Sequence, residues 1–175
     1  MNYVTKRSSI VKNCIAACST VIFAATPAFA ASTIASFPIT ASVITSCALT
    51  TPAALSFGNY SPSNSSALTT STAFSVVCTI GTAYSLGLDA GLSTGASVTT
   101  RKMTSSTATS GNNLLAYGLF KDTSGTNWDN NQTAAGYTAT GLVQAYTIHG
   151  AIPSGQYAVG AATNYTDTIV LTLTY

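Results

Sequence analysis

The amino-acid sequence predicts an all-β protein, folded as a sandwich of antiparallel strands. After the first thirty residues, roughly a third of the chain is Ser or Thr, and the whole sequence contains no glutamate. Thr, Val, Ile and Tyr favour pleated strands, whereas the helix-forming residues Glu, Lys and Arg are scarce. Apolar residues alternate with polar ones in successive segments, and clusters of Gly, Pro, Asn and Ser separate these segments. This spacing is typical of a β-sandwich.

The first thirty residues have the pattern of a secretory signal peptide. Basic residues precede an apolar run from Cys14 to Ala25, and Ala28-Phe29-Ala30 places small residues where a signal peptidase cuts. A transmembrane anchor would need about 20 apolar residues, more than this run supplies. Ile15–Cys18 resembles a lipoprotein cleavage box, but such a box needs a long apolar stretch before its cysteine. Here only Ile10 and Val11 precede Lys12, and most of the apolar run follows Cys18. We therefore expect residues 1–30 to be removed on export.

The remaining 145 residues are enough for one domain with a core and carry little charge. Three basic residues stand against four aspartates, a net charge of −1, although the full sequence has +2. A row of phosphates needs a basic surface to neutralise it, so nucleic acid is excluded as a partner.

Cys47 and Cys78 are the cysteines that remain after the signal peptide. A disulfide is the expected state of such a pair in a secreted domain, and free thiols or metal ligands are the alternatives. The bridge would close a loop of 30 intervening residues. In terms of chain entropy, such a bridge stabilises the fold by about 3 to 4 kcal/mol.

The expected strands of the N-terminal half have apolar residues at every second position. The first spans residues 37–49, and its apolar face consists of Phe37, Ile39, Ala41 and Val43, followed by Cys47. The second covers Leu55–Tyr60 and ends at a polar loop. The third, Ser71–Ile80, has an apolar face of Phe74, Val76, Cys78 and Ile80. The fourth, Ala83–Asp89, follows a turn at Gly81 and has an apolar face of Tyr84, Leu86 and Leu88.

The C-terminal half begins with a Gly-, Ser- and Thr-rich stretch, 90–112, in which only 99–103 resembles a strand. Residues 113–122 form a clear strand with an apolar face of Leu115, Tyr117 and Leu119. After a loop at 123–136, strands are expected at 141–152 and 167–175. The last has an apolar face of Ile169, Leu171, Leu173 and Tyr175. Neither terminal strand carries the Lys or Glu that protects sheet edges, so both are suited to pairing.

Nothing in this pattern indicates catalysis, and we expect neither an enzyme nor a cofactor or metal. His149 is the only histidine, and no Gly-x-Ser-x-Gly turn accompanies it. The four aspartates are scattered singly. Trp128, in the loop 123–136, is either a carbohydrate-stacking residue or a tryptophan that caps the end of the sandwich.

Three stretches of the sequence point to a known family: "IPSGQYAVGAATNYTDTIVLTLTY" at residues 152–175, "LLAYGLFKD" followed by Trp128, and Cys47 after an alternating segment. In that order, they resemble the closing signature, the central strand and the N-terminal region of the spore coat protein U domain family. That family is similar to the pilins of archaic (Csu-type) chaperone–usher pili. The resemblance spans essentially the whole chain after residue 30.

The resemblance implies an immunoglobulin-like sandwich that lacks its final strand and is completed by a donor strand. Residues 31–46 would carry the donor strand and 47–175 the domain. The donor face would be Phe37, Ile39, Ala41 and Val43, and Ile169, Leu171, Leu173 and Tyr175 would border the groove. Pro38 departs from this pattern because proline cannot donate to a strand ladder.

Three functions follow as expectations. The first is a structural pilus subunit for adhesion and biofilm formation, which passes through the periplasm to the cell surface. Its partners would be a periplasmic chaperone, an outer-membrane usher and neighbouring pilin subunits of the same or another kind. The second is a secreted coat or matrix protein of the same fold. The third is a single-domain adhesin or lectin with its site at Trp128.

Overall fold

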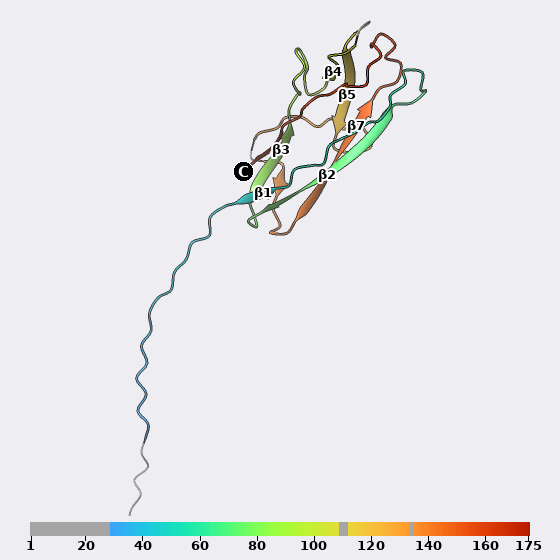
Figure 1. Cartoon of the computed structure of the whole chain (residues 1–175). Helices are drawn as coiled ribbons and strands as arrows, with labels where there is room; N and C mark the ends of the chain where they lie inside the picture. Colours follow the sequence, from blue (N-terminus) through green and yellow to red (C-terminus); the bar gives the residue numbers. More distant parts are fainter. Residues whose placement is uncertain (1–28, 109–111, 134) are drawn as a thin grey trace, which may run out of the picture. The chain divides into compact units, whose positions relative to one another are not determined.

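The computed structural model describes residues 29–108, 112–133 and 135–175. The signal peptide expected at 1–30 lies almost entirely outside these residues. The chain divides into two units, 1–40 and 41–175. The described residues of the first unit, 29–40, are exposed and form no strand. The second unit contains all the strands and is shown in Figure 1.

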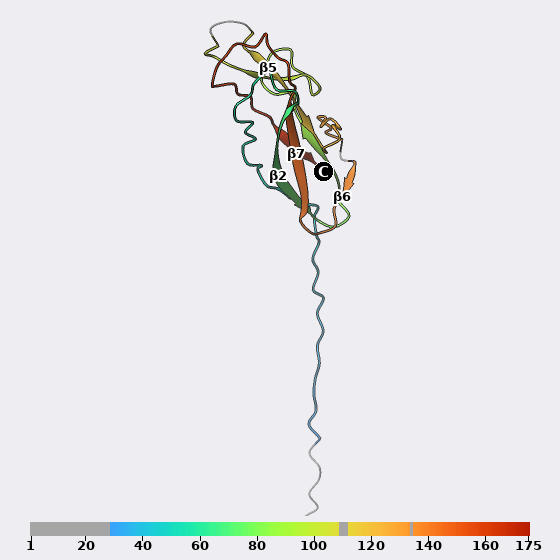
Figure 2. The ribbon, with the colours of Figure 1, turned by 90° about the vertical axis from the view of Figure 1, so that its right-hand side faces the viewer.

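The second unit is an antiparallel sandwich of two sheets, and its described residues include no helix, so the predicted all-β class is confirmed. Its strands are β1 (Cys47–Leu49), β2 (Leu68–Cys78), β3 (Ala83–Leu88), β4 (Arg101–Thr104), β5 (Leu114–Phe120), β6 (Tyr137–Thr138), β7 (Gln144–Ile152) and β8 (Leu171–Thr174). One sheet has the order β1-β2-β7-β5-β4 and the other β6-β3-β8. The long strands β2 and β7 lie side by side in Figure 2 and pair over nine residues, from Leu68↔Ile152 to Val76↔Gln144.

The core lies between the sheets and is built from the alternating faces that the sequence predicts. Its buried members include Phe74, Val76 and Cys78 of β2, Tyr84, Leu86 and Leu88 of β3, and Leu115, Tyr117 and Leu119 of β5. Burying a large apolar side chain stabilises the fold by about 1.5 to 3 kcal/mol. These three strands therefore account for much of the folding free energy.

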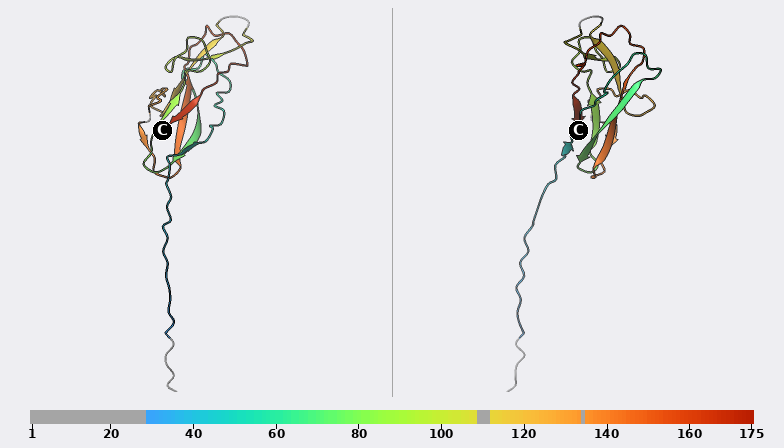
Figure 3. Two further views of the ribbon diagram at one scale, coloured as in Figure 1. Left: turned by 90° about the vertical axis from the view of Figure 1, so that its left-hand side faces the viewer. Right: turned by 45° about the vertical axis from the view of Figure 1, so that its right-hand side comes forward.

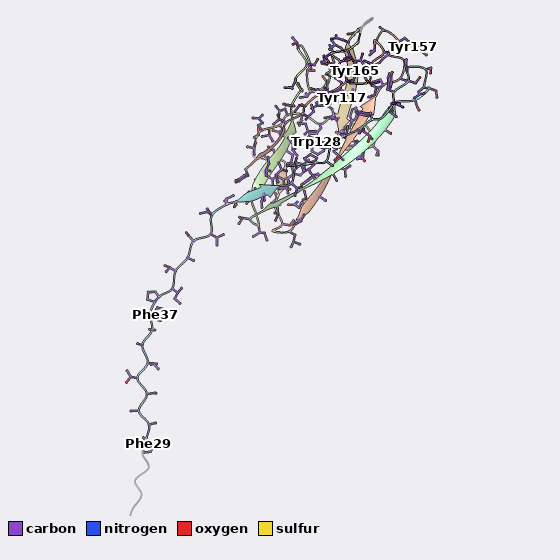
Figure 4. All side chains as sticks on the ribbon, in the orientation of Figure 1. Phe29, Phe37, Tyr117, Trp128, Tyr157 and Tyr165 are labelled. Carbon is purple, nitrogen blue, oxygen red and sulfur yellow. A yellow bond between two sulfur atoms is a disulfide. The ribbon has the colours of Figure 1, made fainter. Side chains whose placement is uncertain are left out.

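Trp128 belongs to this core, although it comes from a loop. Its indole is 1% exposed, lies 5.8 Å from the Phe74 ring, and donates Nε1–H to the Leu86 carbonyl at 3.2 Å. Figure 4 shows it within the sandwich. The ring has no free face for a sugar, so the carbohydrate-stacking alternative is wrong, and Trp128 is part of the core.

Several expected strands differ from those observed. Residues 37–46 and 55–60 are not strands, β8 begins only at Leu171, and β6 was not expected. Leu55 and Phe57 still pack against the core, so their alternation correctly indicates burial but not backbone pairing. Ile80 is 74% exposed because β2 ends at Cys78 and Ile80 lies in the turn that follows, although the apolar alternation continues to residue 80.

Candidate functional site: an open groove between two strand edges

A groove of about 530 Å³ opens between two segments at the margin of the sandwich. One wall is formed by residues 49–57 and the other by residues 165–171, which lead into β8. The floor consists mainly of core side chains: Thr72, Leu88, Met103, Tyr117, Leu119 and Ile148. The right-hand view of Figure 3 shows the C-terminal strand, in red, at this margin of the domain. The groove is therefore an opening into the hydrophobic core.

The C-terminal wall offers unpaired backbone groups. β8 pairs with β3 on one side, and among the described residues no strand pairs with its other side. The Leu88 N–H donates to Asp129 and the Leu86 carbonyl accepts from Trp128, so these β3 groups point away from β8. Leu171 lies opposite Leu88 and Leu173 opposite Leu86 in this ladder. In an antiparallel pair, two opposite residues direct their backbone groups either both toward each other or both away, so those of Leu171 and Leu173 point to the open edge.

The N-terminal wall begins with β1, which has three residues and is held by the predicted disulfide. Cys47 and Cys78 face each other across β1 and β2, with Cα atoms 4.0 Å apart, and are bonded through their sulfurs. β1 is the outer strand of its sheet. A three-residue edge strand makes few backbone hydrogen bonds, so the disulfide provides much of its attachment to the domain.

The residues expected to border the groove divide into two groups. Ile169 and Leu171 line it, and Leu173 packs against the adjacent core. Tyr175 instead is 54% exposed.

On the expected donor segment, Phe37, Ile39 and Val43 are 77%, 85% and 86% exposed, and Ala41 is exposed as well. An apolar face of this size in contact with water is costly, which favours burial against a partner.

Asp167 forms a polar end to the groove. Its carboxylate accepts hydrogen bonds from Leu92 N at 2.8 Å, Thr168 N at 2.8 Å and the Tyr117 hydroxyl at 2.6 Å. Gly91, with a φ of +83°, lies so close that a Cβ there would clash with this carboxylate. Burial, reinforced by the bond to Asp167, raises the pKa of Tyr117 well above its ordinary value of 10.0. Asp167 thus ties the C-terminal wall to the β3–β4 loop.

Arg101 is fully buried behind this end. It donates to four backbone carbonyls, those of Leu88 at 2.8 Å, Asp89 at 2.8 Å, Val98 at 2.6 Å and Trp128 at 2.9 Å. Burial lowers the pKa of Arg101, while attraction to Tyr117, Asp89 and Asp167 opposes that shift. The guanidinium therefore holds together loops that no strand ladder joins.

A comparison with protein families matches residues 33–172 to the spore coat protein U domain. The chain belongs to this family. The family is structural, in agreement with the expectation that the chain is not an enzyme. A search of curated proteins finds no significant match.

The fold of this spore coat U domain is similar to a solved structure, the CsuC–CsuE chaperone–tip adhesion subunit pre-assembly complex from archaic chaperone–usher Csu pili of Acinetobacter baumannii. The two share 21% identity with a TM-score of 0.53. The match covers 76% of this chain and 40% of that chain. At this identity the likeness establishes the fold.

Two side chains that connect distant parts of this spore coat U domain were not identified from the sequence. Arg101 is one, since three of its four acceptors, in Leu88, Asp89 and Trp128, lie 12 or more residues away along the chain. The other is Gln156, whose side-chain amide exchanges two hydrogen bonds of 2.9 Å with the backbone of Ala116 on β5. The only signal for Gln156 was its place in the "SGQY" part of the closing signature. It connects that signature to the central strand.

The other candidate groups of the domain do not assemble into a site. His149 lies on the outer face of β7, opposite Ser71 of β2. In the ranges that the structure describes, no three His, Cys, Asp or Glu side chains gather as metal ligands. No helix among those residues is long and apolar enough to cross a membrane.

Proposed function

We propose that this protein is a structural subunit of a chaperone–usher surface pilus, assembled by donor-strand exchange and serving adhesion and biofilm formation. The observation that carries the proposal is the groove, which opens into the core between the segment that follows β1 and the segment that leads into β8. The same chain also carries an exposed alternating segment, residues 37–43, of the kind that fills such a groove. Strand addition of this type combines backbone hydrogen bonds with side-chain pockets.

The position of Pro38 supports one orientation of the donor strand. Leu171 and Leu173 have their side chains toward the core and their free backbone groups toward the groove. In an antiparallel pair, residues that exchange hydrogen bonds have side chains on the same face. The donor residues that bond to β8 are then the apolar ones, and Pro38 directs its missing N–H away from β8. A parallel donor would lose a bond to β8 at Pro38.

The partners follow from the same groove. A periplasmic chaperone would cover it before assembly, an outer-membrane usher would exchange the chaperone for the next subunit, and neighbouring subunits would fill it in the fibre. The solved complex named above contains a chaperone with a pilus subunit, which supports this role. The protein would pass through the periplasm and end in a fibre on the cell surface.

A truncated chain tests the proposal directly. Residues 45–175 should remain monomeric and bind a synthetic peptide of residues 31–44, whereas the chain that retains those residues should polymerise. The matched control is the same peptide with Ile39→Asp, which should not bind because it would bury a carboxylate in the apolar groove. A truncated chain that is stable and indifferent to the native peptide would refute donor-strand assembly and favour a coat or matrix protein.

A further inference from the structure

Three exposed apolar side chains gather at one end of the domain. Ile80, Leu142 and Val143 are 74%, 73% and 68% exposed. Their turns, 79–82 and 139–143, are joined by hydrogen bonds of 2.8 Å from Gly81 N to the Ala139 carbonyl and from Ala139 N to the Thr82 carbonyl. We call Ile80, Leu142 and Val143 the turn-end patch.

The chain enters the domain from its N-terminal segment beside this patch. Ser46 N donates to the Thr79 hydroxyl at 3.1 Å, and Thr79 N donates to the Ser46 carbonyl at 2.9 Å. Thr79 immediately precedes Ile80. A molecule that holds the residues just before Ser46 is therefore brought next to the turn-end patch.

The opposite end of the domain has a hollow of about 710 Å³, at the end where Figure 4 shows Tyr165. Leu92, which is 76% exposed, stands at this hollow, and Ser105, Asn164 and residues 165–168 line it. Residues 165–168 also line the groove. A strand that leaves the groove past Asp167 therefore passes directly onto this loop-end hollow.

The geometry points to a second contact between successive subunits: we propose that the turn-end patch of one copy docks at the loop-end hollow of the next. This inference rests on the proposed function. A donor antiparallel to β8 ends with Val43 at the Asp167 end of the groove. Two residues, Ile44 and Thr45, lie between Val43 and Ser46, so the three steps from Val43 to Ser46 span about 10 Å when extended. This short connection brings the patch to the hollow of the copy that receives the donor.

The contact joins two different surfaces, so it repeats head to tail along an open fibre. It would also bury the apolar side chains of Ile80, Leu142 and Val143, which are exposed in the single chain. In the fibre these side chains are covered by Leu92 and its surroundings instead of water.

Cysteine cross-linking in the assembled full chain tests this contact. A chain with Leu92→Cys and Leu142→Cys should form, under oxidation, a covalent ladder on non-reducing gels after boiling in detergent. The matched control replaces Ser71 instead of Leu92, since Ser71 is exposed on the outer face of β2. The 92/142 pair should cross-link several-fold more than the 71/142 pair. Adding Val143→Asp should reduce the 92/142 yield several-fold.

A separate pair reports the donor joint itself. Ile39→Cys with Leu171→Cys should cross-link between copies if the donor strand enters the groove. A strong 39/171 ladder with equal 92/142 and 71/142 yields would overturn the docking contact alone. Loss of the 39/171 ladder as well would overturn donor-strand assembly together with the contact that depends on it.

Discussion

Replacing Arg101 with leucine should destabilise the domain by about 4 kcal/mol. Two of its acceptors, the Leu88 and Trp128 carbonyls, are fully buried. A buried carbonyl left without a donor costs about 1 to 3 kcal/mol, so these two together cost about 2 to 6. A typical domain has only about 5 to 15 kcal/mol of stability, so this variant approaches unfolding.

Urea unfolding followed by Trp128 fluorescence measures this change. Trp128 is the only tryptophan, and its buried ring reports loss of the core. Arg101→Lys should recover only part of the loss, because a single ammonium cannot reach four carbonyls arranged around a planar guanidinium. Lys102→Leu, the next residue on β4, is the matched control and should change stability by less than about 0.5 kcal/mol. An Arg101→Leu variant as stable as this control would refute the argument.

Three further predictions concern the walls of the groove and the donor segment. The double variant Cys47→Ser, Cys78→Ser should lose about 3 to 4 kcal/mol in urea unfolding and should bind the donor peptide more weakly; unchanged peptide affinity would contradict a role in holding β1. A donor peptide with Pro38→Ala should bind as the native peptide does, whereas Ile39→Pro should abolish binding in calorimetry. Equal effects of the two would contradict the antiparallel orientation. Tyr117 and Tyr146 both have pKa values raised mainly by burial. Their contribution to stability is therefore complete below about pH 10 and is lost as pH rises toward the folded-state pKa values. Tyr117→Phe should make this loss of stability at alkaline pH less steep.

The sequence predicts the core of this fold well, for a physical reason. β2, β3 and β5 each have one face in the core, so alternation along Phe74–Cys78 or Leu115–Leu119 directly records which side chains are buried. The disulfide was predictable because only two cysteines lie outside the expected signal peptide. The predicted closing strand 167–175 was too long, because β8 begins only at Leu171, after the Asp167 carboxylate has bonded to Leu92 and Tyr117.

The remaining errors have a common cause. Alternation shows which side chains form an apolar face, but it does not show which part of the chain or which partner that face contacts. Residues 37–43 have the pattern of a core strand but are exposed in the single chain. Arg101 could not be identified from periodicity, since its acceptors in Leu88, Asp89 and Trp128 lie 12 or more residues away along the chain. Contacts between distant loops depend on the assembled fold, and a single sequence contains no periodic record of them.

The walls of the groove are held by contacts within the domain. The Cys47–Cys78 disulfide holds the first wall, and Asp167 holds the second through Leu92 and Tyr117. Arg101 fixes the loops behind them. A binding site with fixed walls loses less conformational entropy when a strand enters, so in the proposed assembly more of the burial energy of Phe37, Ile39 and Val43 would be available as affinity. Weakening any of these three supports should therefore reduce donor binding even where the core remains folded.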